Sequence, residues 1–149
     1  MKLGADLDAA AAALIAVLEG VDAERWGAIP EPAVWSIGKE AAHVAEATAY
    51  HQWMVRLTIG EKVSSQRPAI ERKELTTEFS PTQAVDLIRQ LTAKGAALIR
   101  SLTDDQLELP TRPPRARASV LVETIEQVLI AHYDGHRREI EQKLRDARD

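Results

Sequence analysis

Apolar side chains recur at helical spacing in four separate segments of the chain. In the first, about residues 6–19, Leu7, Leu14 and Leu18 lie seven and four residues apart, on one face of a helix. Gly20 follows as a stop signal. The pattern therefore predicts an N-terminal helix over about residues 6–19.

A second helix is predicted from Ser36, a residue well suited to an N-cap, to about Ile59. The polar segment 61–79 that follows contains Pro68 and has no sustained periodicity. We interpret this segment as a long crossover connection between the second and third helices.

The third helix has the clearest start in the chain, because Ser80, Pro81 and Gln83 supply an N-cap, a first-position proline and a capping-box glutamine. It runs to about Leu102. A proline-rich loop follows, and the fourth helix is expected over about residues 119–145. No strand pattern competes with these predictions.

Four helices joined by one long and two shorter connections indicate an all-α four-helix bundle, formed by residues 1–149 as a single domain. A crossover over 61–79 is long enough to return along the bundle and start the third helix beside the start of the second. The expected order is up-down-down-up, which makes the second and fourth helices antiparallel.

Composition supports a globular protein and narrows its partners. The chain is 45% hydrophobic and 28% charged, with a net charge of −4, which argues against nucleic acid as a partner. It contains no cysteine, so disulfides and thiol catalysis by its own side chains are excluded. No apolar run approaches the roughly 20 residues that span a bilayer, and acidic residues near the N-terminus do not fit a signal peptide. We expect a cytoplasmic protein with no membrane segment.

The candidate chemistry lies in four histidines, His43, His51, His132 and His136. The pattern His132-x-x-x-His136 places two imidazoles one turn apart on one helix face, where they can bind one ion. This face includes the apolar stripe of the fourth helix, so both rings are expected to face the bundle interior.

A third ligand would come from the second helix. Depth along antiparallel helices favours His43, because it lies roughly 11 Å into the second helix whereas His51 lies roughly 23 Å in. Face favours His51, which belongs to the buried stripe of Ile37, Ala41 and Val44. The spacing leaves this choice open.

Several stretches together resemble the DinB/YfiT-like superfamily of small bacterial four-helix bundles. They are Trp35-Ser36, Ala42-His43-Val44, and the segment from Ile130 to Ile140 that contains the two paired histidines. The resemblance implies the up-down-down-up order and a metal triad of His43, His132 and His136. It gives His51 no ligand role, and we interpret that residue as a packing or pocket histidine.

Other residues complete the expected site. Tyr50 lies on the same face as His43 and is a candidate catalytic proton donor, while Trp35 is expected to plug the helix entrance. Four acidic residues are candidates for holding the second nitrogen of an imidazole: Glu40, Glu46, Asp134 and Glu139.

Three imidazole ligands leave coordination positions open, which is typical of catalytic rather than structural sites. The resemblance implies a metal-dependent enzyme, and we expect it to act on a small-molecule substrate. Nitrogen ligation admits both zinc and nickel, so we expect one of these two ions. Our first hypothesis is an S-transferase or isomerase that uses a low-molecular-weight thiol as a cofactor. The alternatives are a hydrolase that uses metal-bound water and a non-catalytic binding or stress-response bundle. The resemblance and the apolar helix flanks allow a homodimer.

Overall fold

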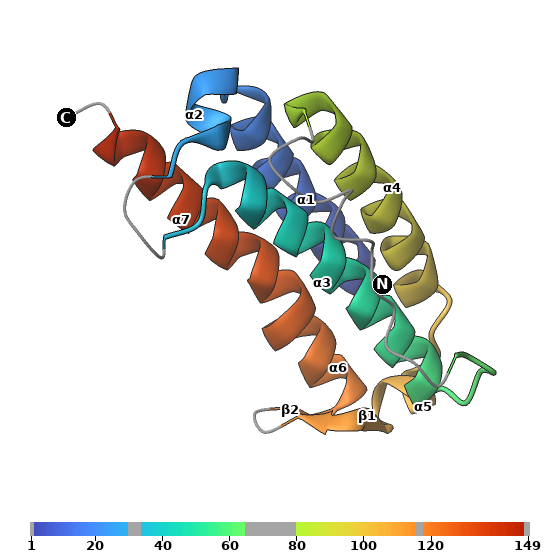
Figure 1. Cartoon of the computed structure of the whole chain (residues 1–149). Helices are drawn as coiled ribbons and strands as arrows, with labels where there is room; N and C mark the ends of the chain where they lie inside the picture. The colour runs from blue at the N-terminus through green and yellow to red at the C-terminus, as the bar shows by residue number, and fades with distance from the viewer. Residues whose placement is uncertain (1, 30–33, 65–79, 116–117, 148–149) are drawn as a thin grey trace.

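The computed structural model describes residues 2–29, 34–64, 80–115 and 118–147, and four long helical rods dominate it (Figure 1). The fourth rod is made of α6 (Leu121–Thr124), a π-helical segment η2 (Ile125–Ile130) and α7 (Ala131–Asp146). The elements in chain order are α1 (Lys2–Glu19), α2 (Ala23–Gly27), α3 (Ile37–Thr58), α4 (Pro81–Arg100), α5 (Asp104–Leu107), β1 (Pro110–Arg115), β2 (Ala118–Val120), α6 (Leu121–Thr124), η2 (Ile125–Ile130) and α7 (Ala131–Asp146).

The four rods follow the predicted up-down-down-up order. In Figure 1, α3 and α4 run in one direction and α1 and α7 run in the other. Both α1 and α3 pack between α4 and α7, so α1 and α3 occupy opposite corners of the bundle. The all-α bundle prediction is confirmed, and α3 lies antiparallel to α7. The crossover predicted over 61–79 falls, from residue 65 onward, outside the described residues.

Helix starts follow the capping signals. The hydroxyl of Ser36 accepts a hydrogen bond from the backbone N–H of Lys39, at 3.1 Å. Ser80 and Gln83 form a reciprocal capping box with Pro81 at the first helical position. These contacts set where α3 and α4 begin. The first helix starts earlier than predicted, at Lys2 rather than near residue 6, because Leu3 is also buried in the core.

The proline-rich segment differs from its prediction as a loop. It contains the short helix α5 and an antiparallel hairpin of β1 and β2. The pairing is irregular between Pro110 and Arg115, since proline has no N–H to donate to a strand partner. Thr58 at the end of α3 accepts a hydrogen bond from the backbone N–H of Arg112 at 2.9 Å, which anchors the hairpin to the bundle.

The π-helical segment changes the core face of the fourth rod. A π turn takes up one more residue than an α turn, so it shifts every later side chain around the helix axis. Ile125, Leu129 and Tyr133 are buried, while His132 and His136 are only half-buried. The two histidines therefore lie at the edge of the core, where they face α3, and not within the apolar stripe itself as the continuous helical pattern predicted.

Tyr133 ties three helices together inside the core. Its hydroxyl lies 2.6 Å from Oγ1 of Thr48 on α3 and 3.0 Å from Oγ1 of Thr92 on α4. Thr48 donates to the backbone oxygen of Val44, so it accepts from Tyr133, which in turn accepts from Thr92. Burial raises the pKa of Tyr133, so the phenol stays neutral. This network fixes the register of α7 against α3.

None of the helices in the described part of the chain combines the length and apolarity that a bilayer crossing requires.

Replacing Tyr133 by Phe should lower the free energy of unfolding by about 1–2 kcal/mol, because two buried threonine hydroxyls lose their partner. Urea denaturation of the metal-free protein measures this. Thr92→Val should cost less, since the bond between Tyr133 and Thr48 survives. A Tyr133→Phe protein within about 0.5 kcal/mol of the wild type would show that the network does not hold the helices.

Candidate metal centre

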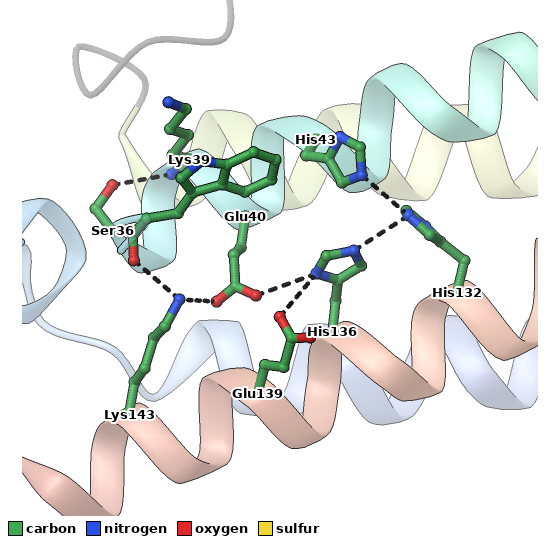
Figure 2. Close-up of polar contacts among 9 residues, drawn as sticks. Ser36, Lys39, Glu40, His43, His132, His136, Glu139 and Lys143 are labelled. Carbon is green, nitrogen blue, oxygen red and sulfur yellow. Dashed lines mark hydrogen bonds and ion pairs between the residues drawn. The ribbon is translucent and has the colours of Figure 1, made fainter. Parts of the chain in front are cut away.

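Three imidazoles from two helices meet at one point between α3 and α7. Nε2 of His132 lies 3.1 Å from Nε2 of His43 and 3.1 Å from Nε2 of His136 (Figure 2). Ligand atoms from all three residues lie within 4.8 Å of one another. The three histidines that the family resemblance singles out are therefore neighbours in the fold.

The antiparallel packing explains which histidine of α3 joins the pair on α7. His43 comes seven residues into α3, level with the first turns of α7. The ring of His51 lies two turns further along, with its centroid 6.1 Å from that of His132, and its side chain is buried. The structure thus brings His43 into the cluster and leaves His51 beside it, in agreement with depth rather than face.

The spacing of the three nitrogens fits a metal ion. With metal–nitrogen bonds of about 2.0–2.1 Å, neighbouring ligand atoms lie about 3.3 Å apart in a tetrahedral shell and about 2.9 Å apart in an octahedral one. The two distances of 3.1 Å between Nε2 atoms fall between these values. The rings are thus placed to share one coordination sphere.

The chemistry of the donors points the same way. A neutral imidazole nitrogen either carries one proton or offers one lone pair. Nε2 of His132 lies at hydrogen-bond distance from two other Nε2 atoms, and one N–H or one lone pair cannot serve both equally. A cation, in contrast, accepts all three lone pairs at once. The residues present therefore fit a bound divalent ion.

A buried carboxylate contacts the other nitrogen of His136. Oε1 of Glu40 lies 3.1 Å from Nδ1 of His136, and Glu40 is 1% exposed (Figure 2). Its Oε2 accepts a hydrogen bond from Nζ of Lys143 at 2.6 Å, and the same ammonium donates to the backbone oxygen of Trp35 at 2.9 Å. Glu139 lies further away, with Oε2 at 3.6 Å from Nδ1 of His136, and is mostly exposed.

Glu40 is ionised in this setting. Burial alone would raise the pKa of its carboxyl, but hydrogen bonds with His136, Glu139 and Lys143 outweigh burial and lower the pKa to about 2. The pKa of Glu139 is raised, chiefly by its hydrogen bond with Glu40. The pKa values of the two carboxyls are therefore shifted apart, and the lower one belongs to the buried Glu40, next to His136.

Of the four acidic residues expected near a second nitrogen, Glu40 and Glu139 lie there. Asp134 instead lies 3.8 Å from the guanidinium of Arg137, and Glu46 lines a nearby pocket. Sequence reasoning missed Lys143. Its position seven residues after His136, on the same face of the helix, is the signal that could have found it.

The ring of Trp35 stands beside the cluster and does not plug the helix entrance as predicted. It is 38% exposed, and its ring centroid lies 5.0 Å from that of His43. Trp26 is the buried tryptophan at the start of α3, at 3% exposure. It packs so close to Gly38 that a Cβ there would lie 2.6 Å from its Nε1.

A cavity of about 330 Å³ opens next to two of the three histidines. It is lined by His43, Glu46, Ala47, Tyr50, His51, Val128 and His132. Tyr50, the predicted catalytic residue, is half-buried in this wall, with its ring centroid 5.7 Å from that of His51. A small molecule in the cavity would thus contact two imidazoles of the histidine cluster, a phenol and a carboxylate.

Comparison with known proteins bears on this site. A family model described as the DinB superfamily matches residues 6–140. A solved structure described as "YfiT from Bacillus subtilis is a probable metal-dependent hydrolase with an unusual four-helix bundle topology" is similar, with a TM-score of 0.80 at 20% sequence identity. The similarity covers 98% of this chain and 86% of that one. No curated protein gave a significant match.

Because Trp35 lies against His43, a paramagnetic ion in the cluster should quench its fluorescence. Titration with cobalt or nickel should lower the tryptophan emission, and Trp35→Phe should remove most of that change. Trp53→Phe is the matched control, since Trp53 lies roughly 15 Å beyond His43 along α3. Equal quenching in both variants would place the ion elsewhere.

Proposed function

Because the chain belongs to the DinB superfamily, we propose that it is a metal-dependent enzyme in which His43, His132 and His136 hold one divalent ion. The observation that carries this proposal is the grouping of three imidazoles across two helices, with Nε2 of His132 at 3.1 Å from Nε2 of both His43 and His136. Nitrogen ligation admits zinc and nickel, and we propose one of these two ions.

The ion supplies Lewis-acid chemistry, because three protein ligands leave positions open for a substrate or a small reactant. The protein's own residues bind the substrate and transfer protons. The pocket wall binds a small molecule against His43 and His132, and its apolar members Ala47 and Val128 exclude water from one side.

Hydrolysis of a small molecule is the reaction that the pocket supports best. Glu46 is the one carboxylate among the described residues that line the pocket, and a carboxylate there can accept a proton from an attacking water. Tyr50 lines the same wall and can donate a proton or a hydrogen bond to the leaving group. The similar YfiT structure, described as a probable metal-dependent hydrolase, supports this class.

Transfer of a low-molecular-weight thiol is the second candidate. All three proposed ligands are neutral, so the charge of the ion stays uncompensated, which favours an anionic partner such as a thiolate. The chain has no cysteine, so the thiol would come from a small cofactor. This hypothesis shares the pocket and the metal site with the first.

Purified, untagged wild-type protein should contain or take up about one equivalent of zinc or nickel, and His132→Ala should take up almost none. Zinc at about 100 times its dissociation constant should raise the free energy of unfolding by about 2.7 kcal/mol in the wild type only. Metal analysis and thermal denaturation measure the two effects.

His51→Ala is the matched control for His132→Ala, because His51 also lines the pocket but lies outside the cluster. It should keep the metal. Equal metal content in the wild type and His132→Ala would refute the metal centre and leave a non-catalytic bundle as the better description.

Tyr50→Phe should keep the metal and lower the rate by about 100-fold or more, because general acid–base catalysis contributes at least this much. Rates are measured on ester and amide panels with metal, and on electrophiles with and without added thiols. Turnover that needs no thiol supports the hydrolase, and turnover that requires one supports the transferase. An unchanged rate in Tyr50→Phe would remove Tyr50 from the mechanism.

A further inference from the structure

We propose that Glu40, itself held by Lys143, is a positioning residue that fixes the tautomer and the orientation of His136, so that its Nε2 lone pair faces the other two histidines. This inference rests on the proposed metal site, because it assigns to Glu40 and Lys143 the preparation of one of its ligands. Neither residue needs to touch the substrate.

The contacts around His136 indicate which of its two ring nitrogens carries the proton. A carboxylate only accepts hydrogen bonds, so the contact of 3.1 Å between Oε1 of Glu40 and Nδ1 of His136 needs a proton on Nδ1. The neutral ring then has no proton on Nε2. That atom faces the cluster, 3.1 Å from Nε2 of His132. A histidine that donates its second N–H to a carboxylate is a better-oriented and more basic metal ligand.

Lys143 holds the carboxylate in place. Its ammonium bridges Oε2 of Glu40, at 2.6 Å, and the backbone oxygen of Trp35, at 2.9 Å. It also offsets the cost of burying a negative charge, which is large for an unpaired carboxylate. Glu40 lies in the first turn of α3, where the helix dipole favours an anion. The carboxylate is therefore held in one position, and its contact with Nδ1 holds the imidazole of His136 in one orientation.

A second metal site is the alternative interpretation of these residues, because Glu40, His136 and Glu139 offer three ligand atoms within 4.8 Å of one another. A second cation there would face the ammonium of Lys143, which is already bonded to Glu40. Glu139 is 62% exposed, so it can turn into solvent. The charges and contacts thus favour a supporting group for His136 over a second metal site.

The first measurement is the protonation of each ring nitrogen in the metal-free protein, by ¹⁵N NMR of the histidine side chains. The wild type should show His136 with its proton on Nδ1. Glu40→Ala should move His136 toward a mixture of tautomers. Glu139→Ala is the matched control, since it removes an acid that faces the same nitrogen at a longer distance; it should leave the tautomer unchanged.

The second measurement is the zinc affinity, by competition with a chelator. Glu40→Ala should weaken binding about 10- to 100-fold, the usual cost of losing such a partner. Lys143→Met should weaken it less, because Glu40 remains. Glu139→Ala should stay within about twofold of the wild type. If circular dichroism shows that Glu40→Ala does not fold, Glu40→Gln replaces it. The amide oxygen of the glutamine can still accept a hydrogen bond from Nδ1 of His136. The tautomer of His136 should then persist, and the zinc affinity should fall by less than in Glu40→Ala.

The two measurements separate this inference from the proposed function. A wild-type His136 with its proton on Nε2, or a Glu40→Ala protein with unchanged tautomer and unchanged affinity, would overturn the role of Glu40. If the wild type binds no zinc, the metal centre fails, and with it the role of Glu40 as a ligand's partner. The NMR result still decides whether Glu40 sets the state of His136.

Discussion

The register of α3 against α7 is the constraint on which the candidate site depends. Two polar contacts fix it: the hydroxyls of Tyr133 and Thr48, level with the paired histidines of α7, and the ion pair of Lys143 with Glu40, about two turns beyond His136. The members of these contacts lie about 15 Å apart along α7 and about 12 Å apart along α3. A slip of one residue would break both contacts and bury unpaired polar groups, which makes it costly. His43 meets the pair on α7 because this register is held.

The cluster itself works against the stability of the metal-free protein. Three ring nitrogens converge on a point where hydrogen bonds cannot satisfy them all equally, and a carboxylate is buried beside them. Folds commonly break local rules at functional sites and compensate elsewhere. Here the apolar packing of α1 and α4 and the ammonium of Lys143 provide the compensation. A bound cation would accept the lone pairs of all three ring nitrogens and so remove the unfavourable contact between them.

Much of this could be predicted from the sequence because the determining signals are local. Helical spacing and capping residues such as Ser36 and Ser80 specified the main helices, and the i, i+4 spacing of His132 and His136 specified a shared face. What helical spacing alone left open or missed depends on contacts between distant segments. The choice of His43 over His51, which spacing left open and the family resemblance resolved, follows from the α3–α7 register. The π segment before His132 and the proline-rich hairpin have no periodic signature, since tertiary packing overrides local preference there.

The two sides of the cluster differ, and this difference sets how a reaction could proceed. On one side, His136 contacts the buried carboxylate of Glu40, which in turn accepts a hydrogen bond from Lys143. On the other, His43 and His132 line a cavity together with Glu46 and Tyr50. A ligand held rigidly on its closed side keeps the geometry constant, while ligands on the open side admit the reacting molecule. In the proposed metal centre, support and access thus fall to different histidines, so a residue that positions His136 can be replaced without blocking the pocket.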